Sequence, residues 1–290
     1  MFRRKTFKLK LRTREVVLGP RTLIMGVLNV TPDSFSDGGK HPSVASAVDA
    51  AFAMQRAGAD ILDIGAESTR PGSRGVSGAE ELARLLPVLE ALEGRLKIPI
   101  SVDTRKAAVA EIALGAGAEM VNDVSGLRHD PRVAEVAARH GAGLVLMHIR
   151  GTPETMQKSP FAKNVTRDVA RGLRRSIAIA RRAGVAKSRI IVDPGIGFGK
   201  SYEQNYELLA KLPTLAKLGY PLLVGTSRKG FIGKTLAPEK GKTAPVEERI
   251  WGTAATVAAA ILNGAHIVRV HDVAEMLQVA RTADGVLQGR

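Results

Sequence analysis

Eight short apolar runs in this chain each end on a polar or charged residue, and segments with helical periodicity separate them. Such a pattern is typical of a (β/α)8 barrel, in which the carboxyl ends of the buried strands and the loops after them form the active site. The sequence therefore predicts an α/β fold, a single (β/α)8 TIM barrel. The expected strands are Thr22–Asn29, Asp60–Asp63, Ile98–Asp103, Glu119–Asp123, Gly143–His148, Arg189–Asp193, Pro221–Ser227 and His266–His271.

The segments between the strands predict helices, several of which are followed by a glycine suited to a left-handed C′ position (Gly58, Gly94, Gly184 and Gly264). The chain of 290 residues suits one domain over 1–290, because such a barrel typically needs about 250 residues. The expected helices are Val44–Ala57, Ala79–Glu93, Arg105–Gly115, Pro131–His140, Val165–Ala183, Tyr202–Leu218, Val246–Asn263 and Val273–Gly285.

The amino-terminal segment is strongly basic, with seven Lys or Arg in its first fourteen residues, which resembles a transit peptide. However, Phe7, Leu9 and Leu11 alternate with basic residues, and this is the period of a strand. We therefore expect residues 1–21 to form a short β-hairpin that caps the bottom of the barrel.

The formal net charge of +15 allows two interpretations, a nucleic-acid surface or solvated basic helix faces. The second is favoured because aromatic content is 4% and no nucleic-acid motif is present. We expect no nucleic-acid partner, although a positive field can attract an anionic substrate. The apolar runs are shorter than the roughly 20 residues that span a bilayer, so no membrane association is expected. The absence of cysteine fits a cytoplasmic protein and excludes thiolate chemistry.

Two long loops rich in Gly, Pro, Ser and Thr follow the first two strands, at Val30–Pro42 and Ala66–Gly78. Their position in the pattern places them over the barrel mouth, and their glycines suit a lid that closes on substrate. The alternative interpretation is two disordered surface loops.

The predicted mouth gathers a mixture of carboxylates, amides and cations, and three kinds of site are possible. A metal cage is disfavoured because only His148 and His271 could supply imidazole ligands. A site in which two carboxylates act as general acid and general base remains possible, since spacing alone does not exclude it. The mouth residues are Asn29, Asp63, Asp103, Asn122, Asp193, Lys229, Arg269 and His271.

The third kind of site, a pocket for a flat aminopyrimidinone ring, uses the mixture most fully. Carboxylates accept paired N–H groups, an asparagine both donates and accepts, and a guanidinium can stack on the ring. Met147, Ile196 and Phe198 would add apolar contact. A cluster of Asn29, Arg70, Arg269 and His271 would suit a pyrophosphate, with Asn29 helping to hold Mg²⁺.

Eight motifs from about Leu23 to the last strand resemble those of dihydropteroate synthases, in the order of that family. Shorter pterin-binding methyltransferase domains share the barrel but are not expected to combine the Ser-Arg-Lys and Arg-Val-His motifs. The motifs are MGVLNVTPDSFSDGG (Met25–Gly39), ESTRPG (Glu67–Gly72), SVDTRK (Ser101–Lys106), NDVSG (Asn122–Gly126), LMHIRGTPETMQ (Leu146–Gln157), VDPGIGFGK (Val192–Lys200), GTSRKGFIG (Gly225–Gly233) and RVHDV (Arg269–Val273).

The resemblance implies condensation of a dihydropterin-CH2-pyrophosphate with p-aminobenzoate, giving 7,8-dihydropteroate and pyrophosphate in folate synthesis. It also implies Mg²⁺ as cofactor and a homodimer formed through the later helices. The residues it assigns to catalysis are Asp103, Asp193, Lys229, Arg269 and His271.

The same resemblance divides the substrate contacts among three regions. The pterin would contact Asp103, Asn122, Asp193 and Lys229, with Arg269 stacked on it. The pyrophosphate would contact Thr69, Arg70, Arg269 and His271, with Asn29 on Mg²⁺. The p-aminobenzoate would lie against Phe35, Pro71, Phe198 and Lys229. Further substrate-binding residues are Met147, Gly225 and Val270, and further loop residues over the site are Asp37, Ser227 and Arg228.

The implied chemistry needs no enzyme nucleophile, which agrees with the absence of a Ser/His/Asp or Cys/His signature. Loss of pyrophosphate would leave a cation at the pterin methylene that the ring delocalises and that the negative charges of Asp103 and Asp193 favour. The arylamine would then attack this methylene carbon.

One position departs from the pattern of many family members, which have Ser where this chain has Gly230. We therefore expect weaker binding of p-aminobenzoate, although amides at the start of the next helix can hold an anion.

Several acidic residues also have structural interpretations. Asp63 would brace loops, Asp123 would brace the NDVSG turn, and Asp272 would cap the last helix. Asp33 and Asp37 would contact Mg²⁺ or stabilise a turn, and His148 would pack at the barrel rim.

Two other functions remain possible. One is a pterin-dependent methyl-transfer or carrier domain, against which Lys229 and the long loops argue. The other is a non-catalytic homologue, which would usually have lost Asn29, Arg70 or Lys229.

Overall fold

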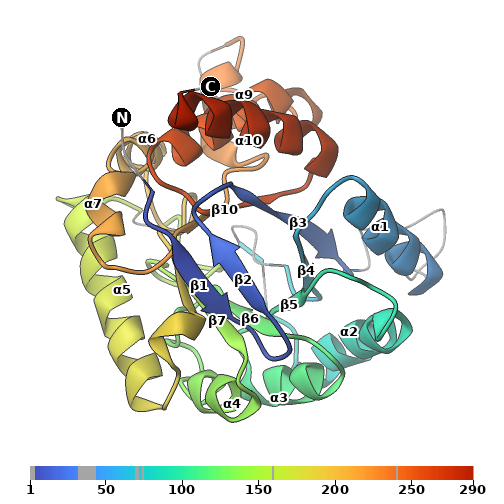
Figure 1. Ribbon diagram of the computed structural model, residues 1–290. Helices are drawn as coiled ribbons and strands as arrows, with labels where there is room; N and C mark the ends of the chain where they lie inside the picture. Colours follow the sequence, from blue (N-terminus) through green and yellow to red (C-terminus); the bar gives the residue numbers. More distant parts are fainter. Residues whose placement is uncertain are drawn as a thin grey trace.

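Eight parallel strands form the centre of the computed structural model, which describes residues 4–31, 44–68, 72–73, 75–158, 160–239 and 241–289 (Figure 1). The spatial order of the strands is β8-β7-β6-β5-β4-β3-β10-β9. A parallel bridge between Val192 and Leu222 joins the two ends of this sheet and closes the barrel. The strands are β3 Leu23–Asn29, β4 Ile61–Gly65, β5 Ile100–Asp103, β6 Met120–Asp123, β7 Gly143–Met147, β8 Ile190–Asp193, β9 Leu223–Val224 and β10 Ile267–Val270. The predicted TIM barrel is confirmed.

Every expected strand except one matches an observed strand to within two residues at each end. The exception is Pro221–Ser227, of which only Leu223–Val224 form β9. A proline has no N–H for the ladder, and here Pro221 contributes only its carbonyl oxygen, which accepts a hydrogen bond from Val192 N at 3.0 Å. At its other end the ladder of β9 stops at Val224, which pairs with Val268.

Helices surround the barrel and cover the outer faces of its strands (Figure 1). Gly58, Gly94, Gly184 and Gly264 all have positive φ just after a helix, as predicted. The helices are α1 Val44–Arg56, α2 Gly78–Leu92, α3 Ala107–Gly115, α4 Val133–His140, α5 Val165–Arg182, α6 Tyr202–Ala210, α7 Leu212–Ala216, α8 Gly230–Leu236, α9 Ile250–Leu262 and α10 Val273–Gln288, with 3-10 turns η1 Lys187–Arg189 and η2 Glu247–Arg249.

The prediction of one continuous helix over Tyr202–Leu218 is wrong. The segment divides into α6 and α7 at Lys211, which ends one helix and begins the next. Pro213 stands in the first turn of α7, where its missing N–H has no helical partner to lose.

The amino-terminal hairpin of β1 Phe7–Lys10 and β2 Glu15–Leu18 is present as predicted. Its side chains Leu9, Leu11 and Leu18 are buried and pack with the first residues of barrel strands, among them Leu23 and Ile61. Figure 1 shows the hairpin lying across this end of the barrel. Apolar side chains thus fill the barrel beneath the hairpin, and Glu119 accepts hydrogen bonds from Thr13 of the hairpin turn at the same end. The single-domain boundary of 1–290 stays a prediction.

In the part of the chain that the structure describes, no helix is both long and apolar enough to cross a bilayer.

Candidate active site

Arg269, at the carboxyl end of β10, is the centre of a buried ionic cluster at the barrel mouth. Its Nε donates to Asp63 Oδ2 at 2.7 Å, and its Nη2 donates to Asp103 Oδ2 at 2.9 Å. Asp63 and Asp103 come from β4 and β5, whose carboxyl ends lie at the same rim. These contacts hold the guanidinium in one orientation, with 22% of its side chain still exposed.

Asp63 is fully buried and holds a second mouth residue as well. The Asn122 side-chain amide, on β6, donates to the same Asp63 Oδ2 at 3.0 Å. Among the described residues, nothing hydrogen-bonds to Asp63 Oδ1. The expected brace is therefore of a different kind: Asp63 orients the side chains of Arg269 and Asn122 rather than loops.

Asp193, at the end of β8, is buried, and its Oδ1 accepts a hydrogen bond from Gly195 N at 2.6 Å. Burial raises the pKa of Asp193 to about 6. The pKa of Asp103 is also raised by burial, against the opposing effect of Arg269. Both carboxylates are poorly solvated, so a ligand that donates N–H groups to them would favour their charged forms.

Lys229 supplies an ammonium group on the same rim. Its Nζ lies 4.0 Å from the ring centroid of Phe198, a cation–π contact. Burial, with Arg269 adding to the effect, lowers the pKa of Lys229 to about 8. The cation and the aromatic ring thus form one wall of the mouth, suited to an aromatic anion.

His271 and Ser227 form a hydrogen-bonded pair beside Arg269. Ser227 Oγ accepts from the His271 backbone N–H at 3.2 Å and lies 2.9 Å from His271 Nδ1. Burial lowers the pKa of His271 to about 4, so the ring is neutral at pH 7. A hydroxyl oxygen can accept two hydrogen bonds, so Ser227 Oγ either donates to Nδ1 or accepts from it, according to the tautomer of the ring. In the tautomer protonated at Nε2, a neutral His271 can donate to an anionic ligand.

The remaining predicted residues fall into three groups. Met147 and Phe198 belong to a small buried apolar cluster with Val124, Ile149 and Met156. Gly225 lies beside Arg269: a Cβ there would be 3.6 Å from that of Arg269. Phe35, Asp37, Thr69, Arg70 and Pro71 lie outside the described residues, as does Asp33.

The side chain of Val270 is fully buried in the core that the barrel shares with its helices. Its neighbour Arg269 turns to the mouth, because successive side chains of a strand point to opposite faces. Only the backbone of Val270 is therefore available to a substrate.

The prediction that Asp272 caps α10 is wrong. Asp272 occupies the N-cap position, but its side chain makes no capping hydrogen bond. Instead, its carboxylate accepts two hydrogen bonds from the Arg228 guanidinium, one of them from Nε at 3.0 Å. Asp272 thereby holds the turn that carries Lys229, in which Arg228 has a φ of 58°.

Asp123 does brace the NDVSG turn, as predicted, accepting from Ser125 N and Leu127 N at 2.7 Å each. His148 is buried at the rim of β7, and burial lowers its pKa to about 3, so the ring is neutral.

Asn29, at the end of β3, is half-buried, and its side-chain amide has no hydrogen-bond partner among the described residues. An amide oxygen fits a hard cation such as Mg²⁺. No group of three or more His, Cys, Asp or Glu in the described ranges could hold a metal ion.

Comparison with known proteins agrees with the kind of site that this geometry suggests. A family model described as "Pterin binding enzyme" matches residues 25–271, which run from β3 to the end of the last barrel strand. The fold and the mouth thus define a pterin-binding enzyme of the (β/α)8-barrel class.

The individual relatives narrow the assignment. The dihydropteroate synthase of Synechocystis is 51% identical over 268 residues, which are 92% of this chain and 91% of that protein. The crystal structure of the Clostridium difficile enzyme in the presence of pteroic acid has a TM-score of 0.85 at 47% identity, covering 93% of this chain and 98% of that one. The Xanthomonas albilineans enzyme with 4-aminobenzoic acid gives 0.88 at 42% identity, covering 97% and 98%. The chain belongs to the dihydropteroate synthase family.

Proposed function

We propose that the protein condenses 6-hydroxymethyl-7,8-dihydropterin pyrophosphate with p-aminobenzoate to give 7,8-dihydropteroate and pyrophosphate. The observation that carries this proposal is the Arg269 guanidinium held between Asp63 and Asp103, at a rim that also bears Asn122, Asp193 and Lys229. The rim combines acceptors for an aminopyrimidinone edge with cations for two anionic substrates. Family membership and the complexes of the relatives agree with it.

In this proposal the pterin edge binds the carboxylates of Asp103 and Asp193 and the amide of Asn122. The paired N–H groups of the ring match carboxylate oxygens, and each charge-assisted hydrogen bond contributes roughly 1.5–3 kcal/mol when water is excluded. Asn122 is held for this task by Asp63. The planar guanidinium of Arg269 stacks against the ring.

The pyrophosphate end binds Arg269 and His271, the latter in the tautomer protonated at Nε2, together with Thr69 and Arg70 of the second loop. Asn29 would help to hold Mg²⁺, which when bound stabilises the negative charge of the pyrophosphate. Arg269 contributes to both ends of the substrate, since it lies between the carboxylates and the phosphates.

The carboxylate of p-aminobenzoate pairs with Lys229, and its ring lies against Phe198. The family resemblance also assigns Phe35 and Pro71, outside the described residues, to this pocket. The bond between the pterin methylene carbon and the pyrophosphate oxygen breaks, and its electron pair leaves with pyrophosphate. The arylamine nitrogen then attacks the methylene carbon and loses a proton. Negative charge on Asp103 and Asp193 stabilises the cation that forms on the ring.

We further propose a homodimer formed through α8 and α9. Trp251 on α9 is 80% exposed, and Leu236 and Val246 nearby are 43% and 41% exposed. Large apolar side chains gathered at a surface favour burial against another protein. A cytoplasmic location and the absence of a nucleic-acid partner stay predictions.

Incubation of the purified protein with Mg²⁺, the pterin pyrophosphate and labelled p-aminobenzoate tests the function. Labelled dihydropteroate is expected from the wild-type protein and not from a folded Lys229→Ala variant. Tight pterin binding without product would instead support a carrier or binding homologue. Neither product nor pterin binding would refute the proposal.

A further inference from the structure

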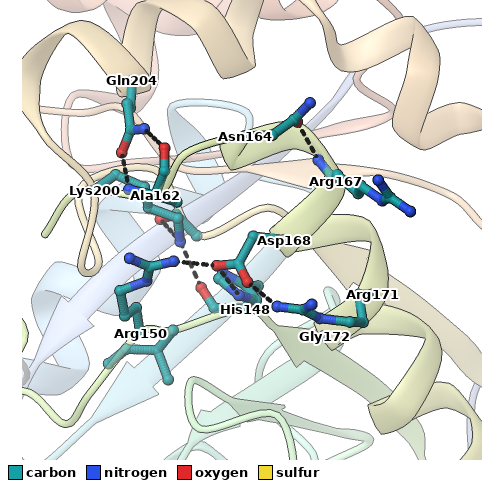
Figure 2. Close-up of polar contacts among 12 residues, drawn as sticks. His148, Arg150, Ala162, Asn164, Arg167, Asp168, Arg171, Gly172, Lys200 and Gln204 are labelled. Atoms are coloured by element: carbon teal, nitrogen blue, oxygen red, sulfur yellow. Dashed lines mark hydrogen bonds and ion pairs between the residues drawn. The ribbon is translucent and has the colours of Figure 1, made fainter.

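Lys200 is a buried lysine at the end of the β8–α6 loop, and none of the proposed substrate contacts uses it. Only 3% of its surface is exposed. Its Nζ donates to the backbone oxygens of His148 at 2.8 Å and Gly195 at 2.7 Å. Figure 2 shows the bond to the His148 oxygen. These oxygens belong to the segments after β7 and β8, so one ammonium group links the two strand ends.

Within the described ranges, this ammonium hydrogen-bonds to backbone oxygens and forms no ion pair with a carboxylate. Burial lowers its pKa to about 7, because removing the ammonium charge from water is costly. A lysine kept in the core at such a cost is unusual, and the two hydrogen bonds are what offset it.

The loop that Lys200 holds passes very close to its neighbour. Gly195 has a φ of 66°, and a Cβ there would lie 2.0 Å from the His148 oxygen. A second buried side chain, Asn205, holds the same loop from α6. Its Oδ1 accepts from Gly197 N at 2.6 Å, and its Nδ2 donates to Ser201 O at 2.8 Å. The β8–α6 loop therefore has one defined path.

The other anchor of Lys200, the segment after β7, is itself fixed to the surrounding helices. Arg150 Nη2 donates to Asp168 Oδ2 of α5 at 2.8 Å. The side-chain amide of Gln204 on α6 accepts from Ala162 N at 3.1 Å and donates to Ala162 O at 2.5 Å. Figure 2 shows both contacts around His148 and Lys200. The oxygen of His148 is thus a fixed point against which the next loop is held.

The β8–α6 loop carries two groups of the candidate site. Gly195 N donates to Asp193 Oδ1 at 2.6 Å, and Phe198 lies under the Lys229 ammonium at 4.0 Å. We propose that Lys200 is a positioning residue: by joining the ends of β7 and β8 it sets the orientation of Asp193 toward the pterin and of Phe198 toward p-aminobenzoate. This inference rests on the proposed roles of Asp193 and Phe198.

The test compares Lys200→Met with Lys211→Met, a change of the same kind at an exposed lysine of the α6–α7 junction. Lys200→Met is expected to keep its fold, to raise the KM of both substrates and to lower kcat/KM at least about tenfold, because two charge-assisted hydrogen bonds are lost. Lys211→Met is expected to match the wild type. If Lys200 had only a structural role, Lys200→Met would lower the melting temperature and the folded fraction and would leave both KM values unchanged.

Rescue gives a second, independent measurement, because the chain has no cysteine. Lys200→Cys, alkylated with 2-bromoethylamine in denaturant and refolded, regains an ammonium only at this position. Iodoacetamide gives the matched neutral adduct, and wild-type protein taken through the same steps measures recovery. We expect aminoethylation, and not carbamidomethylation, to restore both KM values.

Unchanged KM values in Lys200→Met, or a refolded aminoethyl protein no better than the neutral adduct, would overturn the inference. If Lys200→Met does not fold, Lys200→Gln replaces it, since its amide can still donate to one of the two oxygens, and raised KM values are again expected. A wild-type protein without turnover would count against the proposed function, and pterin affinity measured by calorimetry on the same variants would still test Lys200.

Discussion

Asp63→Asn is the substitution that most directly tests the ionic cluster of the mouth. It keeps the shape of the side chain and removes its charge. In the structure Asp63 Oδ2 accepts from Arg269 Nε at 2.7 Å and from Asn122 Nδ2 at 3.0 Å. An asparagine oxygen can still accept one or both of these bonds as a neutral acceptor, and Arg269 keeps its bond to Asp103.

The expected loss follows from the strength of these bonds. A hydrogen bond to a charged group is worth about 1.5–3 kcal/mol and a neutral one about 0.5–1.5 kcal/mol, so the change weakens the hold on Arg269 by about 1–2 kcal/mol. If that energy orients Arg269 in the transition state, kcat/KM falls about five- to thirtyfold. The charge of Asp63 also raises the pKa of Asp103, so its removal lowers that pKa. The part of the acid limb of the kcat/KM profile that Asp103 sets therefore moves to lower pH.

The assay is the pH dependence of kcat/KM for the pterin substrate, with calorimetric pterin binding at pH 7. Asp60→Asn is the matched control, because it makes the same change at a residue away from the mouth. Asp60 directly precedes the amino-terminal end of β4, the strand that carries Asp63, and pairs with Arg21 at the surface. We expect this control to leave kcat/KM unchanged. A kcat/KM for Asp63→Asn within about twofold of wild type, or an acid limb moved to higher pH, would show that the Asp63 charge does not orient the site.

Three further predictions concern other parts of the molecule. Gly230→Ser should lower the KM of p-aminobenzoate up to about tenfold, because a Cβ at this position meets nothing within 4 Å and the hydroxyl can reach a carboxylate; an unchanged or higher KM would exclude that role. For the free wild-type enzyme, kcat/KM should decline toward low pH, as Asp193, whose pKa is about 6, and Asp103, whose pKa is also raised, are protonated, and above about pH 8, as Lys229 loses its proton. A profile flat from pH 5 to 9 would refute this assignment. Trp251→Glu should convert a dimer to a monomer in light scattering after size exclusion, and an unchanged mass would place any interface elsewhere.

The barrel could be predicted from the sequence because its strands are buried on both faces and so appear as short continuous apolar runs. Between them, glycines such as Gly58 and Gly264 ended helices as expected, since both have positive φ. The two errors have local causes. Pro221 shortens the β9 ladder, and Pro213 lets a second helix begin where one continuous helix was expected.

The mouth was predictable to the extent that barrel geometry brings strand ends together, which is why Arg269 and Asp103 meet although 166 residues separate them. What the pattern could not supply was the pairing. Asp272 stands where a helix cap is expected, yet its carboxylate accepts hydrogen bonds from the Arg228 guanidinium, a charged and therefore stronger donor than the helix amides. Alternation along β10 could have separated Arg269 from Val270, whose side chain faces the outer core. The sequence pattern gave no role to Lys200, because it binds the backbone oxygens of Gly195 in its own loop and of His148 in a distant segment, and backbone oxygens leave no trace in a sequence motif.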